Sequence, residues 1–270
     1  MKLKQILLLV LLLISISSFG IKPDSIYVVS PKDYGLSVET EFITTSDKVK
    51  LASWFLPSSI KESKNTSIII SYGDAGNMSY WLHIAVGLAN QGFDVMLYDY
   101  RGFGKSDSFK VNPKILYYPE YITDLNTVVD YAKGVKPNNS ICLMGFSMGS
   151  VISMLYLNNY GYENISSYIG EGHVYSPNKA KEILLSINKE VVLFPDNVDW
   201  SSFYSKMNIP VLLFCGKDDI YCSKEVMESM VNEIKGLRIK KFDGGHLHGY
   251  SILQDNYFKE ISDFVDAVKE

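Results

Sequence analysis

Predicted strands and helices alternate along most of this chain, and this alternation limits its possible folds more than any other feature. The strand-like segments are short and rich in β-branched and apolar residues, and they span 36–45, 49–56, 67–72, 93–99, 140–145, 165–171, 210–216 and 237–242. Apolar residues recur at helical spacing in 79–91, 121–132, 148–159, 224–235 and 251–269. Parallel strands joined by helices form a sheet covered on both faces. The pattern therefore predicts an α/β domain with a mostly parallel, eight-stranded sheet.

Composition is that of a globular domain and argues against a nucleic-acid partner. The chain has 270 residues, of which 47% are hydrophobic and 21% charged. That is enough apolar material for a sizeable core and too much for a disordered chain. The 26 Lys and Arg residues stand against 30 Asp and Glu residues, for a formal net charge of −4. A nucleic-acid-binding domain usually carries a basic excess, so we expect no nucleic-acid partner.

The first 20 residues have the three-part pattern of an export signal. Lys2 and Lys4 precede an apolar run, 6–14, and small residues follow it up to Gly20. Cleavage after Gly20 would leave a domain of residues 21–270 that is secreted or periplasmic. The uncharged stretch 5–21 is also near the lower limit of about 17 residues for a membrane span. An uncleaved anchor, with membrane association through the N-terminus and the domain outside the cytoplasm, is therefore the alternative.

The segment 173–208 interrupts the alternation of strands and helices. It is rich in aromatic residues and loops, and it contains one predicted helix at 178–187. We interpret the segment as a small cap insertion over a site at the edge of the sheet. The alternative is an ordinary long crossover between two strands.

The strongest chemical motif is Gly-Phe-Ser-Met-Gly at Gly145–Gly149, which follows the strand segment 141–144 and opens a predicted helix. A serine at such a sharp strand-to-helix turn presents its hydroxyl at the carboxyl end of the sheet, and flanking glycines relieve crowding. The turn also directs the N–H of Met148, at a helix N-terminus, toward the same place. Ser147 is therefore the candidate nucleophile, and Met148 a candidate oxyanion donor.

A serine needs a general base to act as a nucleophile, and the chain has four histidines. In a domain of this class the partners follow in the order Ser, acid, His, which leaves His246 and His248. His246 comes after two glycines that follow the strand segment 237–242, where a flexible loop can deliver an imidazole. His248 is the alternative base. A His-X-His metal pair is conceivable, but no third ligand is evident, so we expect no metal.

The acid should follow the strand segment 210–216, where Asp218 and Asp219 are adjacent. Their positions alone do not decide between them. Cys215 and Cys222 flank the same loop, and the sequence leaves open whether they pair. A second oxyanion donor should come from the loop after the third strand, which reads Tyr-Gly-Asp-Ala-Gly-Asn over 72–77 and places the N–H of Asp74 there.

These motifs resemble the α/β-hydrolase superfamily, from about Leu36 to the C-terminus. Residues 99–106 are similar to that superfamily's Asp-X-Arg-Gly-X-Gly-X-Ser loop, in which the acidic and basic residues are structural. The loop after the third strand resembles the His-Gly-Asn-Ala-Gly-Asn loop of the Bem46-like and serine-aminopeptidase-like branch. Two positions depart from it: Tyr72 replaces the usual His, and Asp74 replaces the usual Asn.

The resemblance implies an α/β-hydrolase fold with helices on both faces, a small cap and no cofactor. Gly216–Asp219 resembles the family's Gly-X-X-Asp, which favours Asp219 as the acid, and Gly245 with His246 matches its Gly-His. Together with the export signal, it implies an exported serine hydrolase that forms an acyl-enzyme on Ser147 from a small-molecule carboxylic ester or thioester, with an amide less expected. The alternatives are a non-catalytic binding protein on a hydrolase fold and cofactor-free perhydrolase or haloperoxidase chemistry.

Overall fold

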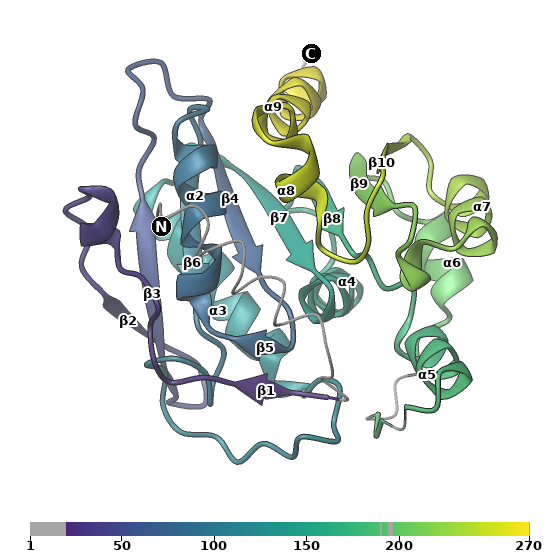
Figure 1. Cartoon of the computed structure of the whole chain (residues 1–270). Coiled ribbons are helices and arrows are strands. Elements are labelled where there is room, and N and C mark those ends of the chain that lie inside the picture. Colours follow the sequence, from purple (N-terminus) through teal and green to yellow (C-terminus); the bar gives the residue numbers. More distant parts are fainter. Residues whose placement is uncertain (1–19, 190, 194–196, 270) are drawn as a thin grey trace, which may run out of the picture.

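An eight-stranded sheet forms the centre of the computed structural model, which describes residues 20–189, 191–193 and 197–269 (Figure 1). Its strand order is β10-β9-β8-β7-β4-β6-β3-β2, and only β3 runs against its neighbours. The bounds are β2 Glu41–Thr44, β3 Lys50–Leu56, β4 Thr66–Ser71, β6 Asp94–Tyr98, β7 Ser140–Phe146, β8 Ser167–Glu171, β9 Val211–Gly216 and β10 Leu237–Phe242. The parallel strands end at one edge, here called the carboxyl edge. The predicted fold class is confirmed.

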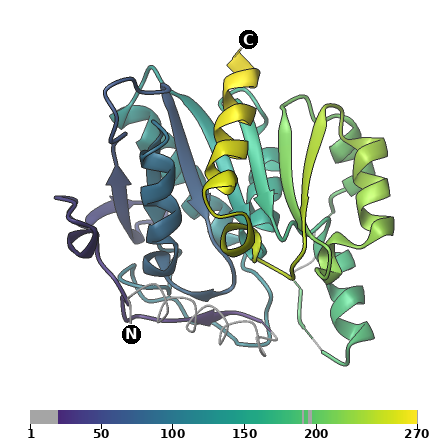
Figure 2. The ribbon, with the colours of Figure 1, turned by 45° about the horizontal axis from the view of Figure 1, so that its top comes forward.

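Helices cover both faces of this sheet (Figure 2). One face carries α2 (Leu82–Ala89) and α9 (Asp255–Lys269), and the other carries α3 (Glu120–Val135) and α4 (Met148–Tyr160). The remaining helices and 3-10 turns are η1 Pro31–Tyr34, η2 Met78–Trp81, α5 Pro177–Ser186, α6 Trp200–Ser205, η3 Ile220–Cys222, α7 Lys224–Glu233 and α8 Gly249–Leu253. Because helices lie on both sides, every residue of β4 and β6 is buried. This explains the continuous apolar run Ile68–Ile70.

Three predicted elements differ in extent. The strand expected over 36–45 is shorter, because only Glu41–Thr44 pair with β3 to form β2. The helix expected over 79–91 begins as η2 and continues as α2. The helix expected over 251–269 is divided into α8 and α9 at Gln254, whose φ of 50° lies outside helical geometry. In this last case the apolar spacing continues across a break in the backbone, so periodicity alone could not show it.

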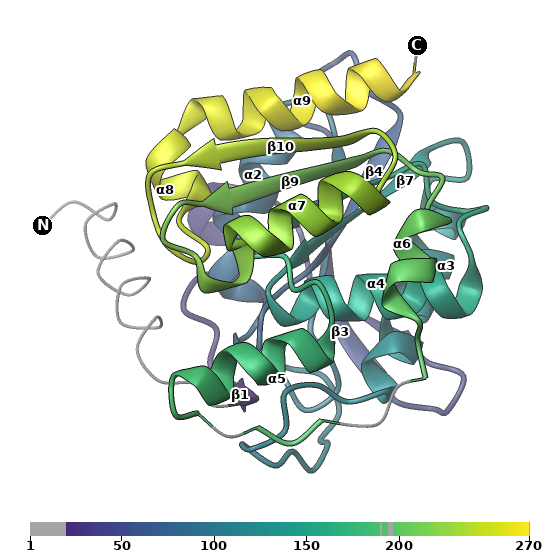
Figure 3. The same cartoon turned by 90° about the vertical axis from the view of Figure 1, so that its right-hand side faces the viewer.

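Two helices form within the segment 173–208. The predicted helix is α5, which Ser176 caps by accepting a hydrogen bond from the Lys179 N–H at 3.0 Å. The second helix, α6, was not predicted, and it packs against α7. α5 contacts η3 and lies on the side of the molecule toward which β9 and β10 point (Figure 3). The interpretation of this segment as a cap stays a prediction.

An unpredicted ribbon of extended chain crosses the carboxyl edge. The short strand β1 (Lys22–Pro23) pairs in parallel with β5 (Ala75–Gly76), directly after the loop that contains Asp74. Ile21 donates its N–H to the Ile115 carbonyl at 2.8 Å, and Val192 pairs with the far side of Ile115. We call these paired segments, 21–23, 75–76, 114–116 and 192, the edge ladder. Figure 1 shows β1 and β5 at the ends of the central strands.

The predictions about export fall on residues 1–19, which lie outside the described residues. Within residues 20–189, 191–193 and 197–269, the structure contains no helix that is both long and apolar enough to cross a membrane.

Candidate active site

Ser147 occupies a sterically constrained turn between β7 and α4. Its backbone has φ 49° and ψ −115°, which is unusual for a residue with a side chain. The two flanking glycines are required by space rather than by flexibility. A Cβ on Gly149 would lie 1.9 Å from the Ser71 carbonyl oxygen, and one on Gly145 would lie 2.8 Å from the Ser150 Cα. The predicted turn geometry at Ser147 is therefore present, and its side chain is partly exposed at the carboxyl edge.

Three of the predicted residues form one hydrogen-bonded series. The Nε2 atom of His246 lies 2.9 Å from the Ser147 Oγ, and its Nδ1 atom lies 2.9 Å from the Asp219 Oδ2. Asp219 is buried, and its Oδ1 accepts the Tyr221 N–H at 2.9 Å, which fixes the carboxylate at the start of η3. The adjacent Asp218 is exposed. Of the two carboxylates that the sequence offered, the structure brings Asp219 to the imidazole.

The other three histidines have different surroundings. His248 accepts the Gly245 N–H on its Nδ1 at 3.2 Å, so it supports the loop that carries His246. His173 lies between the hydroxyls of Tyr168 and Tyr204, and burial lowers its pKa to about 3. Burial also lowers the pKa of His83 to about 4. These last two imidazoles are neutral at physiological pH and are not hydrogen-bonded to Ser147.

Opposing effects act on the pKa of His246. Burial disfavours the imidazolium and would lower the pKa. The hydrogen bond to Asp219 and the negative charges of Asp219, Asp74 and Glu171 favour it more strongly, and the pKa lies above its ordinary value. A general base must be neutral and must gain a proton readily, and a raised pKa favours that gain.

The two predicted oxyanion donors belong to segments that meet at Ser147. Met148 is the first residue of α4, a helix of 13 residues, so its N–H lies at the positive end of the helix dipole. A Cβ on Gly73 would lie 3.7 Å from the Ser147 Cβ, so the loop preceding Asp74 passes directly beside Ser147. The edge ladder holds this loop from outside, because Lys22 donates its N–H to the Asp74 carbonyl at 2.7 Å.

Asp99 anchors the same loop from inside. It is fully buried and accepts the Tyr72 hydroxyl at 3.0 Å and the Met78 N–H at 2.7 Å. The departure at Tyr72 from the family loop thus has a structural role, because its hydroxyl ties the end of β4 to Asp99. Arg101, predicted to be structural, forms ion pairs with Asp124 at 2.7 Å and with Asp47 at 2.6 Å.

Glu171 and Gly172 are functional candidates that the sequence reasoning missed. Glu171 ends β8, and its carboxylate accepts the Gly249 N–H at 2.6 Å and the Tyr257 hydroxyl at 2.7 Å. Burial raises the pKa of this carboxyl to about 7. A Cβ on Gly172 would lie 2.4 Å from the His246 Cε1, so glycine is needed where the imidazole passes. An acidic residue at the end of a predicted buried strand was the available signal, because glutamate is almost never buried without a partner.

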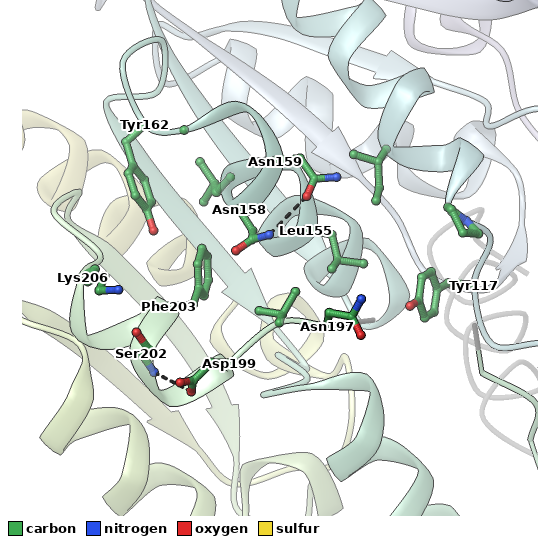
Figure 4. Close-up of a pocket in the computed structure, with 15 residues that line it drawn as sticks. Tyr117, Leu155, Asn158, Asn159, Tyr162, Asn197, Asp199, Ser202, Phe203 and Lys206 are labelled. Carbon is green, nitrogen blue, oxygen red and sulfur yellow. Dashed lines mark hydrogen bonds between the residues drawn. The ribbon is translucent and has the colours of Figure 1, made fainter. Parts of the chain in front are cut away.

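A cavity of about 670 Å³ lies away from these residues (Figure 4). Its walls come from the end of α4, the loop before α3 and the start of α6, and they include Asn158, Tyr162 and Phe203. α4 begins beside Ser147, and about 1.5 Å of rise per residue places Asn159 roughly 18 Å farther along the helix. Ser147, His246 and Asp219 are not among the residues that line the cavity, so it does not open at the Ser147 hydroxyl.

The acid loop also carries two thiols. Cys215 and Cys222 are both buried and free, and the Cys215 thiol and burial raise the pKa of the Cys222 thiol. Within the described ranges of the chain, no group of three or more His, Cys, Asp or Glu side chains could hold a metal ion.

Comparison with known proteins shows full-length relatives and a shared fold. Residues 62–191 match the family model described as serine aminopeptidase, S33. The chain is 28% identical over 259 residues to the uncharacterized protein YfhR of Escherichia coli K12, covering 93% of this chain and 87% of that protein. It is 25% identical over 247 residues to protein bem46 of Schizosaccharomyces pombe, covering 88% and 80%. The Pyrococcus furiosus esterase Pf2001 superposes with a TM-score of 0.73 at 18% identity, over 92% of this chain and 98% of that one.

Proposed function

Since this chain belongs to the α/β-hydrolase superfamily, we propose that it is a serine hydrolase in which Ser147 is the nucleophile. The observation that carries the proposal is the hydrogen-bonded series from Ser147 through His246 to Asp219, with both distances at 2.9 Å. A base within hydrogen-bond reach of the hydroxyl, oriented by a buried carboxylate, is the arrangement that activates a serine.

The reaction then follows from the positions of these groups. Neutral His246 accepts the Ser147 proton as the Oγ attacks the acyl carbon, and Asp219 stabilises the imidazolium that forms. The N–H groups of Met148 and Asp74 donate to the oxygen of the tetrahedral intermediate. The imidazolium gives its proton to the leaving group, which departs from an acyl-enzyme. Water, deprotonated by His246, hydrolyses this ester.

The proposed substrate is a carboxylic ester, with a thioester as the next candidate and an amide less expected. The fold shared with the Pyrococcus furiosus esterase is compatible with an ester. An amide nitrogen needs more complete protonation before it departs than an ester oxygen does, so an ester is the easier substrate. The apolar N-terminal sequence supports export, with the domain acting outside the cytoplasm.

The direct test is labelling with a fluorophosphonate probe, followed by turnover of a panel of esters of increasing acyl length. Wild-type protein should be labelled on Ser147, and Ser147→Ala should lose labelling and at least about 10³-fold in turnover. His173→Gln is a control outside the series, and circular dichroism checks the folding of each variant. Equal labelling of wild type and of a folded Ser147→Ala would contradict the proposal, and so would a wild type that is never labelled.

A further inference from the structure

The N-terminal segment is built into the domain from Gly20 onward. Ile21 is only 1% exposed, and its N–H bonds to the Ile115 carbonyl. A Cβ on Gly20 would lie 2.4 Å from the Pro113 carbonyl oxygen, so Gly20 fills a site shaped for it. If the chain began at Ile21, an ammonium group would replace this buried N–H. Burial of a charge is unfavourable, so the geometry favours a chain that keeps the residues before Ile21.

The sequence that precedes Gly20 is apolar and joins the domain next to the active site. Residues 5–19 contain no charged side chain. They connect through Gly20 to the edge ladder, whose Lys22 holds the carbonyl of Asp74. The residue that joins this segment to the described chain, Gly20, therefore lies at the carboxyl edge, beside the loop that passes Ser147. Any surface to which this segment attaches lies close to the proposed catalytic groups.

The same edge carries exposed apolar side chains. Val192 in the edge ladder is 51% exposed. Leu185 and Ile187, at the end of α5, and Ile220, directly after Asp219, are also exposed. Two exposed cations, Lys22 and Lys114, lie within or next to the paired residues of the ladder. Apolar side chains together with lysines suit the interface of a bilayer that contains anionic lipid.

We propose that the carboxyl edge lies on a lipid bilayer, that residues 5–19 hold it there, and that the acyl substrates are long-chain lipid esters drawn from that bilayer. The substrate class rests on the proposed hydrolase function, whereas the contact with lipid does not. An ester that partitions into the bilayer reaches Ser147 across the edge ladder without passing through bulk water. Burial of the exposed apolar side chains of the edge stabilises this position.

Lipid contact is tested with full-length protein in vesicles of phosphatidylcholine and a minority of phosphatidylglycerol. Tryptophan is introduced at Val192, or at Val231 of α7, which is 58% exposed and is the matched control. The signal of the three native tryptophans is subtracted with wild-type protein. Brominated phosphatidylcholine should quench Val192→Trp several-fold more than Val231→Trp. Equal quenching overturns the proposal. So does a Val192→Trp emission that shifts with protein concentration but not with lipid, because a second copy then covers the edge.

The substrate class is tested by the ratio of two activities of the same preparations. One is turnover of a long-chain monoacyl phospholipid in vesicles, and the other is turnover of a short water-soluble ester. Val192→Glu should lower the vesicle-to-soluble ratio by about tenfold, because a carboxylate opposes insertion, whereas Val231→Glu should not change it. Equal ratios for both variants overturn the substrate class. Absence of turnover on both esters contradicts the hydrolase function, while the quenching result still decides the lipid contact.

Discussion

The turn that carries Ser147 and the loop that carries His246 reach the same point by different means. Ser147 lies between a buried strand and a buried helix, and steric contacts around Gly145 and Gly149 determine its backbone. The His246 loop follows an edge strand, and carboxylates hold it: Asp219 bonds to the imidazole, and Glu171 bonds to the Gly249 N–H. The proposed nucleophile is thus positioned by packing and the proposed base by charge, and the two should respond differently to mutation and to pH.

The largest expected effect comes from Asp219, one of the two carboxylates that hold the His246 loop. Asp219→Asn should lower kcat by about 10²–10⁴, because an amide can hold the wrong imidazole tautomer and does not stabilise the imidazolium. Steady-state kinetics on a short ester measures this, and circular dichroism should show intact folding. Asp218→Asn is the matched control, and its exposed carboxylate should contribute only weak, screened electrostatics. An inactive Asp218→Asn together with an active Asp219→Asn would show that the acid is Asp218 and not Asp219.

On the packed side, Gly149→Ala should lower the free energy of unfolding by about 1–3 kcal/mol, because the new Cβ would overlap the Ser71 carbonyl oxygen. Urea denaturation measures the loss, and probe labelling should fall with it as the turn distorts. Gly134→Ala is the matched control in α3, where a Cβ meets nothing within 4 Å. That substitution should stabilise the protein by up to about 1 kcal/mol. Equal stabilities for the two variants would show that the turn tolerates a side chain.

The pH dependence of kcat/KM tests the role of Glu171, the second carboxylate that holds the His246 loop. The proposed mechanism needs neutral His246, whose pKa is raised, so kcat/KM should rise with pH through a midpoint above about 6.5. Ionised Glu171 favours the imidazolium. Glu171→Gln removes that charge and should move the midpoint to lower pH.

The groups facing Glu171 are His246, Asp219, Tyr257 and Cys222, and this substitution leaves all four in place. A pH-rate profile of Glu171→Gln beside Asp218→Asn separates the charge effect from loss of packing, since a structural defect lowers the plateau without moving the midpoint. Superimposable midpoints for Glu171→Gln and wild type would show that Glu171 only packs.

The smallest effect is expected at His248. His248→Ala loses one long hydrogen bond, from the Gly245 N–H at 3.2 Å, and should change kcat/KM by less than about tenfold. The same assay on His246→Ala should show a flat pH profile at a low rate. Exchange of these two outcomes would transfer the role of base to His248.

The sequence predicted those parts of the site that are formed by residues adjacent in the chain. The turn at Ser147 could be recognised because strand, glycines and helix are contiguous, and the mostly parallel sheet followed from the alternation of elements. The choice of Asp219 over Asp218 came from a resemblance, because adjacent carboxylates look alike until one is buried. The hydrogen-bonded series at Ser147 has the geometry expected from these residues.

Contacts between distant segments could not be predicted in this way. The pairing of β1 with β5, the burial of Glu171 under the loop of His246, and the close approach of His246 to Gly172 join residues far apart in sequence. No periodicity marks a two-residue strand, and a glutamate at the end of a buried strand signals a partner without showing which distant segment supplies it. The helix α6 was missed because six residues are too few for a helical pattern to emerge.

The edge ladder also orders the folding of the chain. Ile21 and Lys22 are among the first residues of the domain to be synthesised, yet their partners lie at Ile115, Asp74 and Ala75. Contacts of such separation in sequence form slowly, so the first segment to be made is expected to dock late. Until it docks, the loop beside Ser147 lacks its outer support even if the sheet is complete. Residues 21–23 would then be the last part of the domain to dock, and the proposed activity would appear only after they have docked.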